Sequence, residues 1–422
     1  MNTTAVRLYG KSDIRLETFP LPPVGPGEIL ARVVSDSLCM SSHKAALQGA
    51  SHKRVPDDVA QNPVILGHEF CGEIVEVGAR WQGAFQPGQR FAIQPALNDP
   101  DDPHAAPGYS FPYIGGGATY IVIPEIVMTR GCLLPYDGDA FFYGSLAEPV
   151  SCIVGAFHTS YHTRPASHEH IPGIVPGGRM AVLAGAGPMG LGAIDYALHS
   201  DVRPVLLVVT DVDDARLTRA AAIYSPAEAA RFGVTLLYVN TASVPEPATH
   251  LRGLAGGGYD DVFVYAPVGA LCQQADALLA YDGCLNFFAG PTDPAFSAPF
   301  NFYNVHYMNT HVAGNSGGTI EDMKEALALM ASGRVRPASM VTHIGGLDCV
   351  PETTLALPKI PGGKKLIYTQ ISLPLTALAD LPALGATDPL CAALADILAE
   401  HNGLWCLEAE RCLLGAATAI DN

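Results

Sequence analysis

A glycine-rich loop between an apolar run and a helical segment constrains the fold of this chain more than any other feature. The loop reads Gly185-Ala186-Gly187-Pro188-Met189-Gly190, follows the apolar run 180–184 and opens a helix predicted over 188–200. Glycines at this spacing permit a tight turn and a close approach of the backbone to a pyrophosphate, and the helix N-terminus supplies amide donors. We therefore predict a dinucleotide-binding βαβ unit whose cofactor contacts include Gly185, Gly187, Pro188, Met189 and Gly190.

An acidic residue at the end of the next apolar run supports the same prediction. Asp211 follows the run 206–210, at about the ~20-residue spacing where a carboxylate accepts a hydrogen bond from a ribose 2′-hydroxyl. A carboxylate at this point repels a 2′-phosphate, so the sequence favours NAD(H) over NADP(H). Arg216 lies in the following helix, where it could offset that repulsion, and NADP(H) is kept as the alternative.

The pattern of the chain changes near residue 155. Before it, short β runs such as 28–34, 72–77 and 119–123 are separated by Pro and Gly turns, as in a barrel-like β domain. From 155 to 318, apolar runs alternate with helical segments, which predicts a parallel sheet covered by helices on both faces. Beyond residue 318 we expect a helix over 320–331, a β run at 365–368 and, in the tail after 373, one further helix over 389–401.

A dispersed set of metal-ligand residues accompanies the dinucleotide unit: Cys39, His68, Glu69 and Glu148. Each has an ordinary structural explanation, as a buried thiol, a core histidine or a surface acid. A catalytic zinc takes three protein ligands from Cys, His and carboxylate and keeps one position open. Together, beside a dinucleotide fold, the four residues therefore indicate a hydride-transfer site in which zinc polarises an alcohol or carbonyl.

Composition excludes several other classes of protein. The chain has 24 Lys and Arg against 41 Asp and Glu, a formal net charge of −17, and no strongly basic arm, so nucleic acid and anionic membrane surfaces are poor partners. The longest uncharged apolar stretch, 180–194, is short and interrupted by glycine, so we expect no membrane span. The start of the chain has no signal-peptide pattern, and the 10 cysteines show no paired spacing. We therefore expect a cytoplasmic location.

Several motifs in order resemble one known superfamily. The segments are Gly67-His68-Glu69-Phe70-Cys71-Gly72-Glu73-Ile74-Val75, Pro87-Gly88-Gln89-Arg90-Phe91, Gly116-Gly117-Ala118-Thr119-Tyr120 and Leu146-Ala147-Glu148-Pro149. The chain resembles the zinc-dependent medium-chain dehydrogenases/reductases, the alcohol and sorbitol dehydrogenase superfamily, over about residues 4–368. Within it the chain is most similar to the sorbose 1-phosphate reductases. That closer likeness rests on residues 36–42, 282–291, 301–307 and the segment Gly108-Tyr109-Ser110-Phe111-Pro112.

The resemblance implies roles for the dispersed residues. Cys39, His68 and Glu148 would bind zinc, with Glu69 as a ligand or a close alternative to water, and Ser41 would begin a proton relay. The family's four closely spaced cysteines for a structural zinc should lie near 94–112, where this chain has none, so we expect one catalytic zinc and no structural zinc.

Two further departures from the family lie just after the ligand cysteine. Ser42 replaces the usual aspartate, which removes a charge near the zinc. Lys44 stands where a relay histidine is usual, and His43 is displaced from that position by one residue. Lys44 is therefore a candidate catalytic residue.

Two groups of cations stand out in this acidic chain. Lys44, Lys53 and Arg54 form either a solvated loop or an anion pocket for a substrate phosphate, since Lys and Arg give charge-assisted hydrogen bonds. Lys364 follows two glycines, in an area where the family places a basic residue against the cofactor pyrophosphate.

These observations combine into one expected enzyme. We expect a GroES-like catalytic domain from 1–154 and 319–422, with a tail at 374–422, and a Rossmann domain at 155–318. The expected reaction interconverts a ketose phosphate and a polyol phosphate with NAD(P)(H), as in the reduction of L-sorbose 1-phosphate to D-sorbitol (glucitol) 6-phosphate. The alternatives are a zinc polyol dehydrogenase for unphosphorylated sugars and a zinc-free, quinone-reductase-like dinucleotide binder. The family implies a homodimer or homotetramer.

Overall fold

The computed structural model describes residues 1–421, which divide into two compact units. The first unit comprises 1–149, 319–331 and the chain from 341 onward; the second comprises 150–318 and 332–340. The first unit is therefore built from both ends of the chain. No helix in the described part of the chain is long and apolar enough to cross a bilayer.

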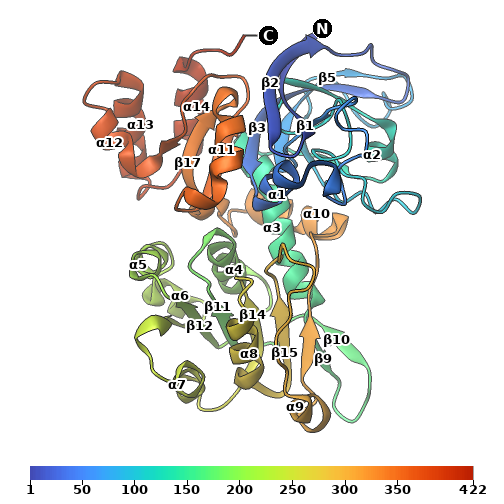
Figure 1. Ribbon diagram of the computed structural model, residues 1–422. Coiled ribbons are helices and arrows are strands. Elements are labelled where there is room, and N and C mark those ends of the chain that lie inside the picture. The colour runs from blue at the N-terminus through green and yellow to red at the C-terminus, as the bar shows by residue number, and fades with distance from the viewer. Residues whose placement is uncertain (422) are drawn as a thin grey trace. The chain divides into compact units, whose positions relative to one another are not determined.

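A six-stranded parallel sheet forms the centre of the second unit (Figure 1), in the order β13-β12-β11-β14-β15-β16. Its strands are β11 (Arg179–Leu183), β12 (Leu206–Asp211), β13 (Thr235–Asn240), β14 (Tyr259–Val264), β15 (Leu279–Phe287) and β16 (His311–Ala313). The helices of this unit are α4 (Pro188–His199), α5 (Asp214–Ile223), α6 (Pro226–Arg231), α7 (Pro247–Leu254), α8 (Gly269–Leu278) and α9 (Phe302–Tyr307). A separate hairpin pairs β9 (Tyr161–Thr163) with β10 (His170–Pro172).

Side chains on both faces of this sheet are buried, which explains why its strands read as continuous apolar runs. On one face, Val262 packs with Leu251 of α7 and Cys272 of α8. Phe263 points to the opposite face, because side chains alternate along a strand. There its ring lies 4.8 Å from that of Phe157, which belongs to α3 (Phe141–Thr159). The predicted parallel sheet with helices on both faces is confirmed.

The first unit is a β domain in which β3 (Ile29–Leu38) pairs with three other strands. Its main sheet has the order β19-β17-β18-β3-β5-β6-β8, with β7 also on β3, and a smaller sheet has the order β2-β1-β4. The other strands are β1 (Asn2–Gly10), β2 (Asp13–Pro20), β4 (Val64–Ile65), β5 (Phe70–Val77), β6 (Arg90–Ile93), β7 (Tyr120–Ile123), β8 (Leu133–Pro135), β17 (Val341–Gly346), β18 (Lys364–Tyr368) and β19 (Thr376–Ala377).

The core of this unit follows the period-two pattern of its central strand. Ile29, Ala31 and Val33 alternate along β3 and pack with Phe70 and Phe91 in one buried cluster. Around the sheets lie α1 (Met40–Gln48), α2 (Glu125–Thr129), α10 (Ile320–Ala331), α11 (Val350–Ala356), α12 (Leu381–Leu384), α13 (Pro389–Glu400) and α14 (Leu407–Ala416). The predicted barrel-like β domain is confirmed.

Two parts of the fold differ from the sequence-based expectation. The region before residue 155 holds not only β runs but also the 19-residue helix α3, which contains Pro149. The tail after 373 was expected to hold one helix; it contains α13 close to the expected place, and also α12 and α14. A helix buried along most of its length has no clear apolar period, so the sequence pattern alone does not separate α3 from the β region before it.

Candidate active site

Two neighbouring antiparallel strands bring the predicted metal ligands together. Cys39 directly follows β3, and His68 and Glu69 directly precede β5. Because Asp36 of β3 pairs with Phe70 of β5, the end of one strand lies beside the start of the other. The Cys39 sulfur, a His68 ring nitrogen and a Glu69 carboxylate oxygen lie within 4.8 Å of one another.

Burial controls the protonation of this cluster. It raises the pKa of the Cys39 thiol to about 12 and lowers the pKa of His68 to about 3, so the imidazole is neutral and keeps a lone pair. Sulfur, neutral imidazole and carboxylate are the donors that zinc takes, and binding a cation would release the thiol proton. The residues present therefore fit a zinc ion.

Lys364 of β18 holds Glu69 in place. Its Nζ lies 2.5 and 2.6 Å from the two carboxylate oxygens of Glu69, and both side chains are buried. Burial alone would raise the pKa of Glu69, but the Lys364 ammonium holds it below its ordinary value. Lys364, which the resemblance grouped with the cofactor residues, thus lies in the first unit against a candidate metal ligand.

Glu148 of α3 lies near the same cluster. Its side chain is 7% exposed, and its charge raises the pKa of both Cys39 and Lys364. Its carboxylate is not among the donor atoms that lie within 4.8 Å of one another. The structure therefore brings Glu148 to the edge of the group formed by Cys39, His68 and Glu69.

Two hydroxyl groups orient the His68 imidazole. Ser42 Oγ lies 3.1 Å from His68 Nδ1, and the Tyr109 hydroxyl lies 2.9 Å from the same nitrogen. Ser42, identified in the sequence as the loss of a carboxylate, thus still supplies a hydrogen-bonding partner. The Nε2 atom faces Glu69, with 4.0 Å between Nε2 and Oε1. Sequence reasoning assigned no role to Tyr109, although its segment carried the closer resemblance.

The candidate relay residues point in different directions. The Cys39 thiol donates to Ser41 Oγ at 3.5 Å, which puts that hydroxyl at the cluster. Burial lowers the pKa of Lys44, while the nearby Cys39 raises it. His43 is buried and its Nδ1 donates to the backbone carbonyl of Thr354 in α11 at 2.8 Å. Ser41 is therefore at the cluster, and Lys44 is close enough to Cys39 for their charges to interact. The His43 Nδ1 is used by the packing of α1 on α11.

The candidate phosphate-binding cations form one group with His52. Burial and then the charges of Arg54, Lys53 and Lys44 lower the pKa of His52 to about 4. Arg54 also lies over the Tyr109 ring, with 5.2 Å between its guanidinium carbon and the ring centroid. Positive charge is therefore concentrated beside the side chain that contacts His68.

In the second unit the glycine loop has the geometry that the sequence predicted. The Gly185 amide donates to Thr210 at 2.8 Å, and Pro188 is the first residue of α4. A Cβ on Gly190 would lie 2.1 Å from the Gly185 carbonyl oxygen, so only glycine allows this helix to pack so close to the turn. A Cβ on Gly187 would meet no atom within 4 Å, which leaves space at the helix N-terminus where Met189 is also half-buried.

Asp211 turns its carboxylate toward this loop. Its Oδ2 accepts from the Ala186 amide at 3.2 Å, and its Oδ1 accepts from Val212 at 2.8 Å. Arg216 is about half exposed and lies 3.6 Å from Asp213. The carboxylate is thus held against the glycine loop that follows β11. The strand order reverses between β11 and β14, and dinucleotides bind at such a reversal in open α/β sheets.

The start of α3 is anchored by residues from distant parts of the first unit. Glu410 of α14 accepts hydrogen bonds from the Phe141 and Phe142 amides at 2.7 and 2.9 Å. Tyr368 donates to the same carboxylate at 2.9 Å. Because a helix N-terminus has unpaired amides, a carboxylate there stabilises the helix that carries Glu148.

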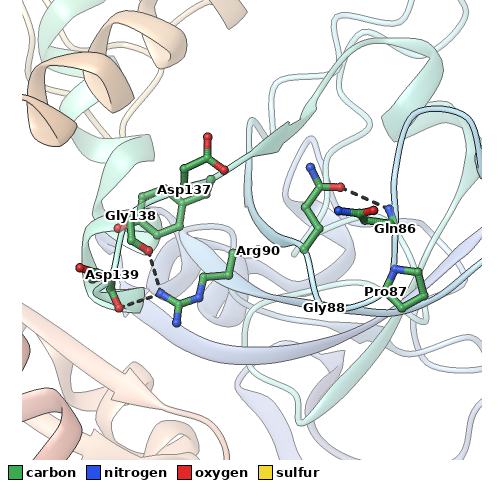
Figure 2. A pocket seen from close by; sticks show the side chains of 9 residues that line it. Gln86, Pro87, Gly88, Arg90, Asp137, Gly138 and Asp139 are labelled. Atoms are coloured by element: carbon green, nitrogen blue, oxygen red, sulfur yellow. Dashed lines mark hydrogen bonds between the residues drawn. The ribbon is translucent and has the colours of Figure 1, made fainter.

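A pocket of about 450 Å³ lies beside this helix start. Figure 2 shows Arg90 at its side, where one guanidinium nitrogen donates to the carbonyls of Gly138 and Asp139, both at 2.7 Å. The residues that line it are Gln86, Pro87, Gly88, Gln89, Arg90, Tyr136, Asp137, Gly138 and Asp139, and none was predicted as a site residue. Its side chains supply no cluster of metal ligands.

The described part of the chain contains a second group of three metal-ligand side chains. His401, Cys406 and Glu408, near α14, also bring donor atoms within 4.8 Å. Its histidine and glutamate are 41% and 60% exposed, whereas His68 and Glu69 are 4% and 1% exposed. The group around Cys406 is therefore much more open to solvent than the group around Cys39.

Comparison with known proteins gives matches to two family models. Residues 25–131 match the alcohol dehydrogenase GroES-like domain, and residues 188–332 match the zinc-binding dehydrogenase model.

Relatives and a solved structure cover most of the chain. The L-sorbose 1-phosphate reductase of Klebsiella pneumoniae is 54% identical over 99% of this chain and 98% of its own length. The mannitol-1-phosphate 5-dehydrogenase of Aliivibrio fischeri is 51% identical over 98% of this chain and 97% of its own. The structure of 2R,3R-butanediol dehydrogenase from Bacillus subtilis matches with a TM-score of 0.70 at 21% identity, covering 87% of this chain and 99% of that one.

Proposed function

The chain belongs to the zinc-binding, alcohol dehydrogenase-type oxidoreductases, and from that premise we propose that it interconverts a ketose phosphate and a polyol phosphate. The preferred pair is L-sorbose 1-phosphate and D-sorbitol 6-phosphate. A bound nicotinamide dinucleotide would supply the hydride that the carbonyl carbon takes up, and a proton would go to the carbonyl oxygen. The opposite direction returns both.

One observation carries this proposal: the metal-ligand cluster and the cation group share a side chain, Tyr109. Its hydroxyl contacts His68, and Arg54 lies over its ring. A protein with a net charge of −17 repels a sugar phosphate unless cations gather locally. A carbonyl-activating centre bordered by Lys44, Lys53 and Arg54 is suited to a phosphorylated sugar.

The residues of the first unit divide the chemistry between them. Cys39, His68 and one carboxylate would hold one zinc ion. The carboxylate is Glu148, as the resemblance implies, or Glu69, whose oxygen lies within 4.8 Å of the Cys39 and His68 donor atoms and is fixed by Lys364. When bound, zinc supplies a Lewis acid that polarises the substrate oxygen. Ser41 Oγ, 3.5 Å from the Cys39 sulfur, is the hydroxyl that moves the proton toward solvent.

The second unit binds the nicotinamide dinucleotide. The loop from Gly185 to Gly190 and the N-terminus of α4 would hold the pyrophosphate, and Asp211 would accept a hydrogen bond from the ribose 2′-hydroxyl. The buried Asp211 carboxylate, already at the loop through Ala186, disfavours a 2′-phosphate, so NAD(H) is the proposed cofactor over NADP(H).

A ketose 6-phosphate is the second candidate substrate. The 51%-identical relative is a mannitol-1-phosphate 5-dehydrogenase, and a hexitol phosphate oxidised at that carbon has its phosphate at the far end of the chain from the carbonyl. Both candidates use the same cations, and they differ in the distance from phosphate to reacting carbon.

A panel of substrates with the purified protein tests the proposal. NADH and NADPH consumption is measured with L-sorbose 1-phosphate, D-fructose 6-phosphate and the two free ketoses. We expect kcat/KM to be highest for the 1-phosphate and at least a hundredfold lower for the free sugars. Equal turnover of free and phosphorylated sugars would refute the phosphate part of the proposal.

Metal analysis tests the zinc assignment independently. Cys39→Ser should remove one zinc per chain and nearly all turnover, because a direct ligand is lost. Cys406→Ser is the matched control, since it alters the other Cys-His-Glu group, and it should keep that zinc. Retention of both zinc and turnover by Cys39→Ser would show that the site lies elsewhere.

Assembly and location stay predictions. The family implies a homodimer or homotetramer, and light scattering on the purified protein measures its mass. A cytoplasmic location follows only from the sequence argument, and cell fractionation tests it.

A further inference from the structure

Tyr109 joins the two halves of the candidate site. It is fully buried, and its hydroxyl lies 2.9 and 3.3 Å from the two ring nitrogens of His68. The same hydroxyl interacts with Ser41 and with the charges of Cys39 and Glu148. The hydroxyl end of this side chain therefore lies at the candidate metal cluster.

The ring of Tyr109 faces the cation group. His52 stacks on it, with 5.8 Å between centroids and 13° between planes, and the Arg54 guanidinium carbon lies 5.2 Å from its centroid. A guanidinium over an aromatic face is held by cation–π attraction while its outer nitrogens remain able to donate. The ring thus determines where Arg54 can receive an anion.

The backbone on either side of Tyr109 is fixed to both partners. Gly108 has φ +79°, and a Cβ there would lie 2.0 Å from the Gly67 carbonyl oxygen, so this loop presses against the segment that carries His68. On the other side, Ser110 Oγ donates to the Arg54 carbonyl at 2.7 Å. The loop therefore connects the segment that carries His68 with the backbone of Arg54.

We propose that Tyr109 is a specificity-determining residue that selects ketoses whose phosphate is on the carbon next to the carbonyl. This inference rests on the proposed function and extends it. The Tyr109 hydroxyl contacts His68 of the metal-ligand cluster, and Arg54 covers a face of the same phenol ring. The metal-ligand cluster and the cation group are therefore separated by only one aromatic ring. A ketose 1-phosphate, with the phosphate ester one carbon from the carbonyl, spans that short separation, whereas a ketose 6-phosphate places the phosphate at the far end of the sugar.

The test compares kcat/KM for L-sorbose 1-phosphate and D-fructose 6-phosphate in the zinc-loaded enzyme. Wild type should prefer the 1-phosphate by at least tenfold. Tyr109→Phe keeps the ring, so the ratio should stay within about twofold while kcat falls for both substrates. Tyr109→Leu removes the ring and should reduce the ratio at least tenfold, and Arg54→Ala should do the same if the leucine variant does not fold.

Tyr113→Phe is the matched control, because Tyr113 lies in the same loop and is 37% exposed. It should change neither ratio nor kcat, and zinc content should be equal in all variants that are compared. An unchanged ratio in both Tyr109→Leu and Arg54→Ala would overturn the inference, as would a wild type that turns over both phosphates equally. In those cases the proposed function stands; a wild type that turns over no ketose phosphate refutes the proposed function itself.

Discussion

Removing the Lys364 ammonium should destabilise the first unit by several kcal/mol. Lys364 makes two charge-assisted hydrogen bonds to Glu69, at 2.5 and 2.6 Å, and the two side chains are only 7% and 1% exposed. Such bonds contribute about 1.5–3 kcal/mol each when solvent does not screen them. Breaking a buried ion pair by deleting one partner costs about 3–5 kcal/mol, because the remaining charge is left uncompensated. We expect Lys364→Met to lower the free energy of unfolding of the metal-free protein by that amount.

Urea denaturation followed by tryptophan fluorescence measures this change. The chain has two tryptophans, Trp81 and Trp405, and both lie in the first unit, so the signal reports that unit. The double variant with Glu69→Gln should recover about 2–3 kcal/mol, since it removes the orphaned charge.

The neighbouring lysine provides the control for this measurement. Lys365 is also buried, but its Nζ donates to the backbone carbonyls of Ile360, Pro361 and Gly363. Lys365→Met should therefore show no recovery from Glu69→Gln. A loss below about 1 kcal/mol in Lys364→Met, or equal recovery in both lysine variants, would refute the argument.

Three further measurements test other parts of the structure. Asp211→Ala should lower the ratio of kcat/KM for NAD to kcat/KM for NADP at least tenfold. The change deletes a hydrogen-bond acceptor for the ribose and a charge that repels a 2′-phosphate. A wild type that prefers NADP would contradict the role assigned to Asp211. Glu410→Gln should replace one acceptor at the start of α3 with a donor, which should lower the free energy of unfolding by about 1–2 kcal/mol. It should also weaken zinc binding in a competition with a chelator. An unchanged zinc affinity would show that the anchoring of α3 does not affect the metal site. Asp282→Asn should cost about 1 kcal/mol at pH 7. Hydrogen bonds from His311 and Thr163 outweigh burial and hold the pKa of Asp282 below 3.8, so its ionised form contributes stability above that pH and loses it as the pH falls through the folded-state value. The difference in unfolding free energy from wild type should therefore shrink as the pH falls below about 4; a difference at pH 3 equal to that at pH 5 would contradict this.

The sequence predicted the bounds of those helices and strands whose boundaries are determined by residues within the element and the loop beside it. The helix predicted over 320–331 is α10 with the same bounds, and the helix predicted over 188–200 is α4, ending one residue earlier. β12 ends at Asp211, as predicted. In each case apolar periodicity and a strong boundary residue agree, because the local conformation and the tertiary fold require the same residues.

Elements stabilised by distant residues were not predicted. The amides that begin α3 are paired by Glu410, 269 residues further along the chain from Phe141. Pro149 inside this helix also argues against a helix in any local reading, since proline removes a backbone donor. Tertiary contacts here override the local signals.

The candidate metal site was predictable in composition but not in its surroundings. Residue types marked Cys39, His68, Glu69 and Glu148 as candidate ligands, and the family resemblance implied that Cys39, His68 and Glu148 bind one zinc ion, with Glu69 as a ligand or close alternative. That Lys364 fixes Glu69, or that Tyr109 lies between His68 and Arg54, depends on strand pairings and loop contacts across long sequence separations. No spacing rule along the chain contains that information.

The contact between Glu410 and α3 also has a consequence for the order in which the protein matures. Synthesis proceeds from the N-terminus, so Glu148 and its helix are made long before the acceptor that pairs with the Phe141 and Phe142 amides. A nascent chain that stops short of α14 therefore carries an α3 whose first turn is unpaired. Completion of the helix that carries Glu148 thus depends on translation reaching the C-terminal segment, and a prematurely terminated product would emerge with the start of this helix unanchored.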